Sequence, residues 1–142
     1  MLSHAVESIE IAIPARELCS FLAERQNLPK WTNAFMRVGD KSATMKTEGG
    51  SVRVGLEVVA AAESGSVDWI MTFPDGARAT AFSRVVPTAS DRSIYVFVLT
   101  PPPVPLERIE GTLGQQRITL REELFRLRAI LEDPATHERQ SV

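Results

Sequence analysis

Histidine and cysteine, the residues most used in nucleophilic triads and zinc sites, are scarce in this sequence. The chain has two histidines, His4 and His137, near its two ends, and one cysteine, Cys19. A nucleophile–base–acid arrangement and a zinc site each need several such side chains close together. We therefore expect no catalytic triad, no metal and no cofactor. Cys19 is interpreted as a small core residue, because a reactive thiol needs cationic neighbours.

Two other side chains could act on a ligand. Arg84 offers a guanidinium that would hold a carboxylate or an enolate. Tyr95, the only tyrosine, could donate a proton, although the residues expected to face inward on its strand are Ile94, Val96 and Val98. The sequence does not decide which of two sets of residues on the strand 77–86 points inward. One set is Ala79, Ala81, Ser83 and Val85, and the other is Thr80, Phe82 and Arg84. If the small set points inward, the room that it leaves is itself a pocket.

Two further motifs are interpreted as structural. Glu122 and Glu123 are neighbours on a predicted helix and point in different directions, so both are expected in solvent. Gly49-Gly50 lacks the lysine and the spacing of a phosphate-binding loop, and we predict a hairpin turn there.

A long helix over residues 106–131 is the element around which the rest is organised. Its apolar residues recur at intervals of three and four, which places them on one face. They are Leu106, Ile109, Leu113, Leu120, Leu124, Leu127 and Leu131. Gln116 and Arg117 interrupt this row, and Gly111 and Gly114 lower helix propensity. We predict that the half from Leu120 onward anchors the helix and that the first half can border a cavity.

The chain before this helix is predicted to form strands and two short helices. Alternating apolar residues predict strands over residues 5–13, 35–39, 43–47, 52–58, 67–73, 77–86 and 94–99, with helices over 15–24 and 28–31. Tight turns favour an antiparallel meander, and the prolines of 101–105 form an extended spacer. Glu7 shares the face of the isoleucines in the first strand, either at a strand end in solvent or lining a cavity.

Composition limits the class of protein. The 142 residues suit one domain, expected over 1–134 with a flexible polar tail over 135–142, and 44% of them are hydrophobic. With a net charge of −2 and no basic patch, we expect no nucleic-acid partner. No apolar run approaches the roughly 20 residues of a membrane span, and the N-terminus lacks the features of a signal peptide. We expect a cytoplasmic protein.

Several segments resemble the START-like (SRPBCC) superfamily, in its polyketide cyclase/dehydrase and lipid-transport branch. They are Ile11-Ala12-Ile13-Pro14-Ala15, Phe21-Leu22-Ala23, Asn27-Leu28-Pro29-Lys30-Trp31, Phe73-Pro74-Asp75-Gly76, Arg84-Val85-Val86-Pro87 and Leu124-Phe125-Arg126-Leu127. The resemblance implies an α+β helix-grip fold, in which a curved antiparallel sheet of about six to seven strands wraps a long C-terminal helix. It also implies a largely apolar cavity between the sheet and that helix.

We therefore predict that the protein binds an apolar or aromatic small molecule, lipid-like or polyketide-like, in this cavity. The cavity candidates are Trp31, Phe35, Trp69, Phe73, Arg84, Val96, Leu113, Gln116 and Leu120. One alternative is an enzyme of the polyketide cyclase/dehydratase type, which a polar residue in an enclosed pocket would favour. Another is a protein-interaction module similar to chaperone activators, which a cavity filled by its own side chains would favour. Tyr95, Phe97 and Leu99, if they face outward, suggest a homodimer.

Overall fold

The computed structural model describes residues 4–47, 50–100 and 106–133, with the backbone alone for 47 and 106–113. The helices are α1 (Ala15–Ala23), the 3-10 turn η1 (Arg25–Asn27), α2 (Leu28–Trp31) and α3 (Leu106–Leu131). The strands are β1 (Ala5–Ile11), β2 (Phe35–Val38), β3 (Ser42–Thr47), β4 (Gly50–Ala61), β5 (Ser66–Thr72), β6 (Arg78–Ala89) and β7 (Arg92–Leu99). Among the described helices, none is long and apolar enough to cross a membrane.

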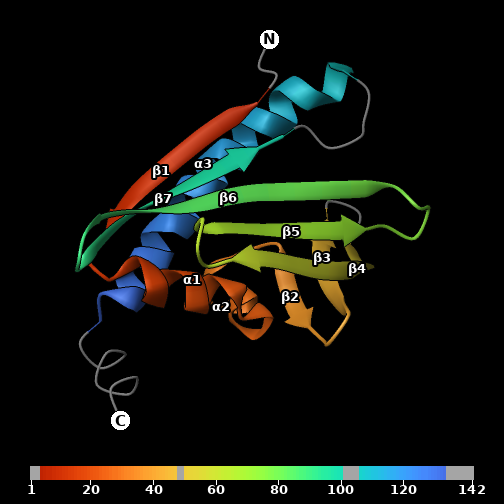
Figure 1. Ribbon diagram of the computed structural model, residues 1–142. Helices are drawn as coiled ribbons and strands as arrows, with labels where there is room; N and C mark the ends of the chain where they lie inside the picture. Colours follow the sequence, from red (N-terminus) through yellow and green to blue (C-terminus); the bar gives the residue numbers. More distant parts are fainter. Residues whose placement is uncertain (1–3, 48–49, 101–105, 134–142) are drawn as a thin grey trace.

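All seven of these strands form one antiparallel sheet in the order β1-β7-β6-β5-β4-β3-β2. The sheet curves, and α3 crosses one of its faces beside β1 and β7 (Figure 1). On that same side α1 packs against β4, β5 and β6, whereas α2 packs against α3 and β2. The predicted helix-grip fold is therefore confirmed, including the long C-terminal helix over 106–131.

The structure corrects the end of β6. The strand was expected to stop before Pro87, but it continues to Ala89. Pro87 faces Ser93 on β7 at a register shift between Pro87 and Ala89, and a proline is tolerated where a ladder is locally disrupted. The predicted proline spacer 101–105, the tail 135–142 and the turn residues 48–49 lie outside the described residues.

One glycine fixes the turn between β4 and β5. Gly65 has φ of 78°, and a Cβ atom there would lie 2.1 Å from the carbonyl oxygen of Val85. The amide of Val85 donates a hydrogen bond of 2.7 Å to the Gly65 oxygen. Only glycine allows this approach of the turn to β6.

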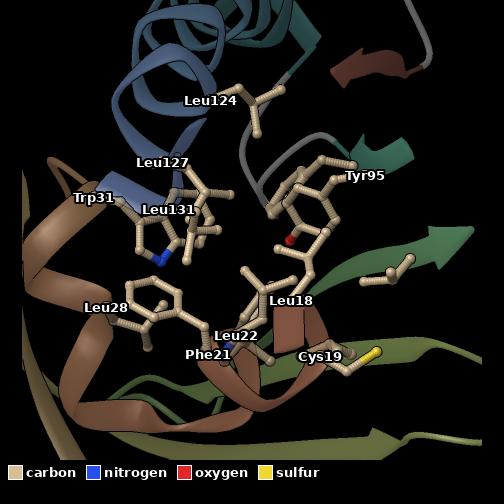
Figure 2. Packing of buried hydrophobic residues seen from close by; sticks show 14 of the residues in the cluster. Leu18, Cys19, Phe21, Leu22, Leu28, Trp31, Tyr95, Leu124, Leu127 and Leu131 are labelled. Atoms are coloured by element: carbon tan, nitrogen blue, oxygen red, sulfur yellow. The ribbon is translucent and has the colours of Figure 1, made fainter. Parts of the chain in front are cut away.

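Among the described side chains of α3, four leucines of its second half belong to the core. Leu120, Leu124, Leu127 and Leu131 are buried, with at most 3% of each exposed. Figure 2 shows Leu124, Leu127 and Leu131 directed into the same interior region as Trp31, Tyr95 and the α1 residues Leu18 and Leu22. The leucine spacing in the sequence therefore predicted the buried face of this half of the helix.

Tyr95 and Phe97 are on the inner face of β7, which contradicts the expected orientation. Tyr95 pairs with Ile9 on β1 and with Val85 on β6, and all three are buried. Ile94 and Val96 therefore occupy the outer face and are only half-buried. Val98 alternates with them and is also half-buried, but it borders the cavity described below. The strip of Tyr95, Phe97 and Leu99 that suggested a homodimer is not at the outer surface.

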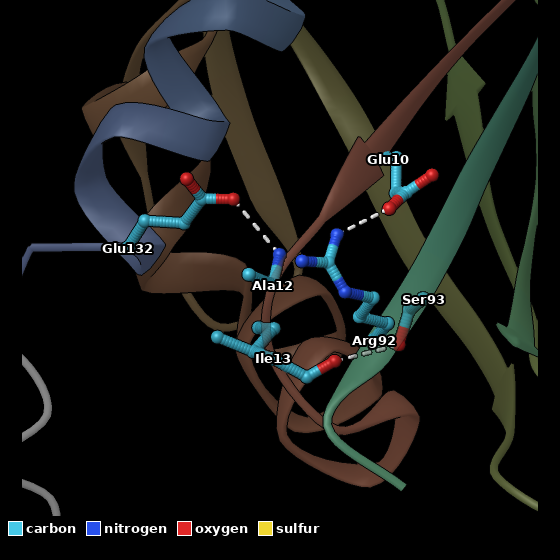
Figure 3. Close-up of polar contacts among 6 residues, drawn as sticks. All are labelled: Glu10, Ala12, Ile13, Arg92, Ser93 and Glu132. Atoms are coloured by element: carbon cyan, nitrogen blue, oxygen red, sulfur yellow. Dashed lines mark hydrogen bonds and ion pairs between the residues drawn. The ribbon is translucent and has the colours of Figure 1, made fainter. Parts of the chain in front are cut away.

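Polar contacts tie α3 and the end of β1 into the sheet. Glu132, just after α3, accepts a hydrogen bond of 2.8 Å from the amide of Ala12 (Figure 3). Ser93 Oγ, which is buried, donates to the carbonyl oxygen of Ile13 at 2.9 Å. The nearby pair of Glu10 and Arg92 is more than half exposed and contributes little to stability.

Glu7 joins β1 to α3 through two arginines. Its side chain is 11% exposed and accepts hydrogen bonds from Arg117 Nε at 2.6 Å and Arg121 Nε at 3.1 Å. Burial opposes ionisation of this carboxyl, but the hydrogen bonds and charges of the two arginines outweigh it and lower its pKa. Glu7 is thus a partly buried partner of the helix and not a strand end in solvent.

Replacing Leu124 with alanine should destabilise the protein by about 2–5 kcal/mol, because it removes a buried side chain that the surroundings cannot fully replace. Urea unfolding followed by circular dichroism measures this. The matched control is Ile118→Ala on the exposed side of the same helix, where Ile118 is 56% exposed and a change within about 0.5 kcal/mol is expected. Equal losses at both positions would contradict the described burial of α3.

Replacing Glu7 with glutamine should lower stability by about 1–2 kcal/mol at pH 7, because the charge that attracts Arg117 and Arg121 is lost. A lowered folded pKa gives stability that is complete above the unfolded value of about 4.3 and is lost as pH falls through the folded pKa. Unfolding curves of both proteins between pH 7 and pH 3 should therefore converge at low pH. A constant gap would exclude the ion pairs as its cause.

Candidate ligand-binding cavity

A cavity of about 500 Å³ lies between the inner face of the sheet, α2 and α3. The residues that line it come from α2, from β2, β3, β5, β6 and β7, from the segments just after α2, β5 and β7, and from α3. They are Leu28, Trp31, Thr32, Ala34, Phe35, Met45, Trp69, Met71, Phe73, Arg78, Ala79, Thr80, Ala81, Phe97, Val98, Leu99, Thr100, Gln115, Gln116, Thr119, Leu120 and Glu123. Arg78, Thr100 and Gln115 are also exposed at the protein surface, so the cavity reaches solvent.

Small side chains on β6 create the room for this cavity. Ala81 lies opposite Trp69 on β5, and Ala79 lies opposite Met71. The next residues of the same face, Ser83 and Val85, are buried in the core, whereas Phe82 on the other face is exposed. The small residues therefore face inward, which decides between the two orientations that the sequence left open for this strand.

Aromatic side chains form one end of the cavity and the core beneath it. Ring centroids lie 6.2 Å apart for Trp31 and Trp69, and 6.1 Å apart for the stacked Trp69 and Phe97. Tyr95 contacts Trp31 and Phe97 edge-on at 6.3 and 6.2 Å but does not line the cavity. Such offset and edge-to-face contacts are favourable arrangements for aromatic rings, and they give this end of the cavity a rigid apolar wall.

The polar atoms of Trp31, Trp69 and Tyr95 are shielded from water. Trp31 Nε1, Trp69 Nε1 and Tyr95 Oη are buried without a hydrogen-bond partner among the residues that the structure describes. Burial raises the pKa of the Tyr95 hydroxyl far above its usual value. Because water cannot reach these atoms, a molecule in the cavity contacts the indole rings and not their N–H groups. Tyr95 is not placed to donate a proton to it.

The opposite wall, on α3, is polar. Gln116, Thr119 and Glu123 line the cavity at intervals of three and four residues, with Leu120 between them and Gln115 at the margin. This spacing places all three polar groups on one face of the helix. A molecule in the cavity therefore has aromatic and aliphatic side chains on the sheet side and hydrogen-bonding groups on the helix side.

Glu123 joins this wall to the segment that follows α2. Its Oε2 accepts a hydrogen bond of 2.7 Å from the amide of Asn33. Arg126 donates to Asn33 Oδ1 at 2.8 Å and to the carbonyl oxygen of Trp31 at 3.3 Å. Burial raises the pKa of Glu123, against the opposing effects of the Asn33 amide and Arg126, and the charge of Glu122 raises it further.

The sequence-based interpretation missed Glu123, which was expected in solvent beside Glu122. The signal was present in the spacing, because Gln116, Thr119 and Glu123 recur at helical intervals. The leucines dominate the apolar face of this helix, so the polar residues beside them are interpreted as the border of that face and not as a polar face of their own. Glu122 is exposed, as predicted.

Six of the nine predicted cavity residues line the cavity in the structure: Trp31, Phe35, Trp69, Phe73, Gln116 and Leu120. Arg84 and Val96 do not, and this corrects their placement. The two are paired across β6 and β7 on the outer face, and Arg84 Nε donates to the carbonyl oxygen of Ser64 at 3.0 Å. The side chain of Leu113 lies outside the described part of the chain.

Among the described residues, no three His, Cys, Asp or Glu side chains are close enough to hold a metal ion. Cys19 is buried, and burial raises the pKa of its thiol. The described polar groups that line the cavity can form hydrogen bonds with a ligand.

Comparisons with known proteins support the fold. Comparison of the sequence with protein-family models gave no match, nor did comparison with curated proteins. Among solved structures, the protein XoxI from Bacillus cereus is similar with a TM-score of 0.67 and 16% identity, over 93% of this chain and 97% of that one. A START superfamily protein from Mycobacterium smegmatis has a TM-score of 0.58 and 16% identity, over 85% and 93%.

A third similar structure is the ZhuI aromatase/cyclase from a Streptomyces species, with a TM-score of 0.63 and 11% identity over 98% of this chain and 95% of that one. At such low identity the similarity concerns the fold alone. The fold is the helix grip that the sequence resemblance implied, and these solved structures share it.

Proposed function

We propose that this protein binds a planar apolar or aromatic small molecule, of lipid-like or polyketide-like character, in the cavity between the sheet and α3. The observation that carries the proposal is the cavity of about 500 Å³ with an aromatic end and a polar wall. This volume lies in the range of small-molecule sites, about 300–1,000 Å³. Such sites are mostly apolar with a few polar groups that fix orientation.

The distribution of side chains supports a flat ligand. Trp69 and Phe97 are stacked with 21° between their ring planes, and both line the cavity. Met71, Ala79 and Ala81 extend the apolar surface on this side of the cavity, and the two alanines do so without filling the space. A flat apolar ring system would bury its surface here, and burial of apolar area is the main favourable term in such binding.

A second candidate function is an enzyme of the aromatase/cyclase type acting on a ligand of the same class. The observation that favours it is Glu123, a carboxyl on the cavity wall whose pKa is raised by burial. A carboxyl that faces a ligand and whose pKa is raised toward the working pH can act as a general acid or base. The similar structure of an aromatase/cyclase is consistent with this function but, through the fold alone, does not establish it.

A protein-interaction module is less well supported. That function was expected to go with a cavity filled by the protein's own side chains, and the cavity here is open. A cytoplasmic location remains a prediction. A homodimer also remains one, although the strip of Tyr95, Phe97 and Leu99 that suggested it is not at the outer surface.

Binding of an apolar fluorescent probe, N-phenyl-1-naphthylamine, should quench or shift the intrinsic tryptophan emission. Both tryptophans of the chain, Trp31 and Trp69, line the cavity, so the emission reports on the cavity directly. Fluorescence titration checks this. Probe saturation without any change in tryptophan emission would mean that the probe binds elsewhere.

Replacing Ala81 with phenylalanine should weaken probe binding by about tenfold or more, because the larger ring occupies cavity volume that the probe needs. The matched control is Ala61→Phe on β4, where Ala61 is exposed and away from the cavity. The control should bind the probe as the wild type does. Equal weakening in both variants, or in neither, would argue against the cavity as the binding site.

A further inference from the structure

Glu123 is the only acidic side chain among the described residues that line the cavity. The other polar side chains of the α3 wall, Gln115, Gln116 and Thr119, are neutral. Arg78 lines the cavity from the start of β6 and is exposed. The strongest hydrogen-bond acceptor of the α3 wall is therefore the Glu123 carboxylate.

The two oxygens of this carboxylate have different roles. Oε2 accepts the hydrogen bond from the Asn33 amide at 2.7 Å, which fixes the orientation of the group. Oε1 has no hydrogen-bond partner among the described residues, although a carboxylate oxygen can accept two. Oε1 is not shielded from water as the unpaired indole nitrogens are, so a hydroxyl of a ligand would take the place of solvent on this oxygen.

The charged groups around Glu123 favour a neutral ligand over a cation. Arg126 lies one turn away on α3 and attracts the carboxylate, although its own hydrogen bonds go to Asn33 and Trp31. Its charge offsets part of the negative charge that Glu123 and the neighbouring Glu122 place at this end of the cavity. A cation would lose its hydration against aromatic walls, opposite a carboxylate whose attraction Arg126 weakens, whereas a hydroxyl loses much less.

We propose that Glu123 is the specificity-determining residue of the cavity and accepts a hydrogen bond from a hydroxyl group at the edge of a planar aromatic ligand. The ring system packs against Trp69, Phe97 and the alanines of β6, and its hydroxylated edge faces α3. The ligand class is thereby narrowed to hydroxylated polycyclic aromatic molecules. This inference rests on the proposed binding function.

The test compares 1-hydroxypyrene with 1-methoxypyrene, which differ in the donor that Glu123 would recognise. Binding of both is measured by fluorescence titration at about pH 6.5, where a phenolic hydroxyl is neutral. Wild-type protein should bind 1-hydroxypyrene about tenfold more tightly, the usual effect of a hydrogen bond to a charged group. Equal affinities in the wild type would overturn the inference.

The variant Glu123→Gln should reduce this preference to about threefold or less, because the neutral amide is a weaker acceptor and still bonds the Asn33 amide, so the fold is kept. The matched control Glu122→Gln, at an exposed neighbour on the same helix, should keep the wild-type preference. A preference unchanged in Glu123→Gln, or lost equally in Glu122→Gln, would exclude Glu123 as the recognising group. Absence of binding for both pyrenes in the wild type would instead reject the proposed binding function.

Discussion

Burial of the leucine row in the second half of α3 is the interaction on which the rest of this structure depends. Leu120, Leu124, Leu127 and Leu131 remove a continuous apolar surface from water, and they do so only because the sheet curves around them. Burial of each such side chain contributes about 1.5–3 kcal/mol. With this half of the helix fixed, the segment from Gln115 to Leu120 is carried across the inner face of the sheet, where it becomes a cavity wall.

Polar contacts determine where along the sheet the helix is held. Glu7 on β1 binds Arg117 and Arg121, and the Ala12 amide binds Glu132 beyond the helix end. Between these points, Glu123 and Arg126 bind the segment after α2. Hydrogen bonds of this kind contribute modest net stability but are costly to leave unmade, so they favour one position of the helix over its neighbours.

The cavity exists because side-chain volume is unevenly distributed on the inner face. Protein interiors are normally close-packed, and Trp69, Tyr95 and Phe97 pack in this way. On β6, by contrast, Ala79 and Ala81 have only methyl groups to meet the large residues of β5. Leaving apolar space unfilled lowers stability, and departures from full packing are expected where a protein acts on other molecules. Glu123 contributes both to the packing around the cavity and to the cavity itself. It accepts a hydrogen bond from Asn33 in the segment after α2, and it lines the cavity.

The sequence by itself determined the elements, the fold class and the buried face of α3's second half. Alternation at two residues and leucine spacing at three and four are local properties of the backbone geometry, so Val67, Trp69 and Met71 or Leu120, Leu124 and Leu127 could be assigned without knowledge of their neighbours. The motifs that resemble START-like proteins then led to the helix-grip arrangement. The tryptophans, Phe35, Phe73 and Gln116 were placed at the cavity by this argument.

Only the tertiary structure decided which face of β6 and β7 is inside and which polar group faces the cavity. On both strands either alternate set is acceptable from the sequence, and a shift of one residue exchanges the faces. The pairing of Tyr95 with Ile9 and Val85 selects one of them, which moves Arg84 and Val96 to the outside. Glu122 and Glu123 are likewise equivalent as residue types, and they differ because the helix is held at a rotation that turns Glu123 toward Asn33. Register and helix rotation depend on contacts between residues far apart in the chain, and local patterns do not contain them.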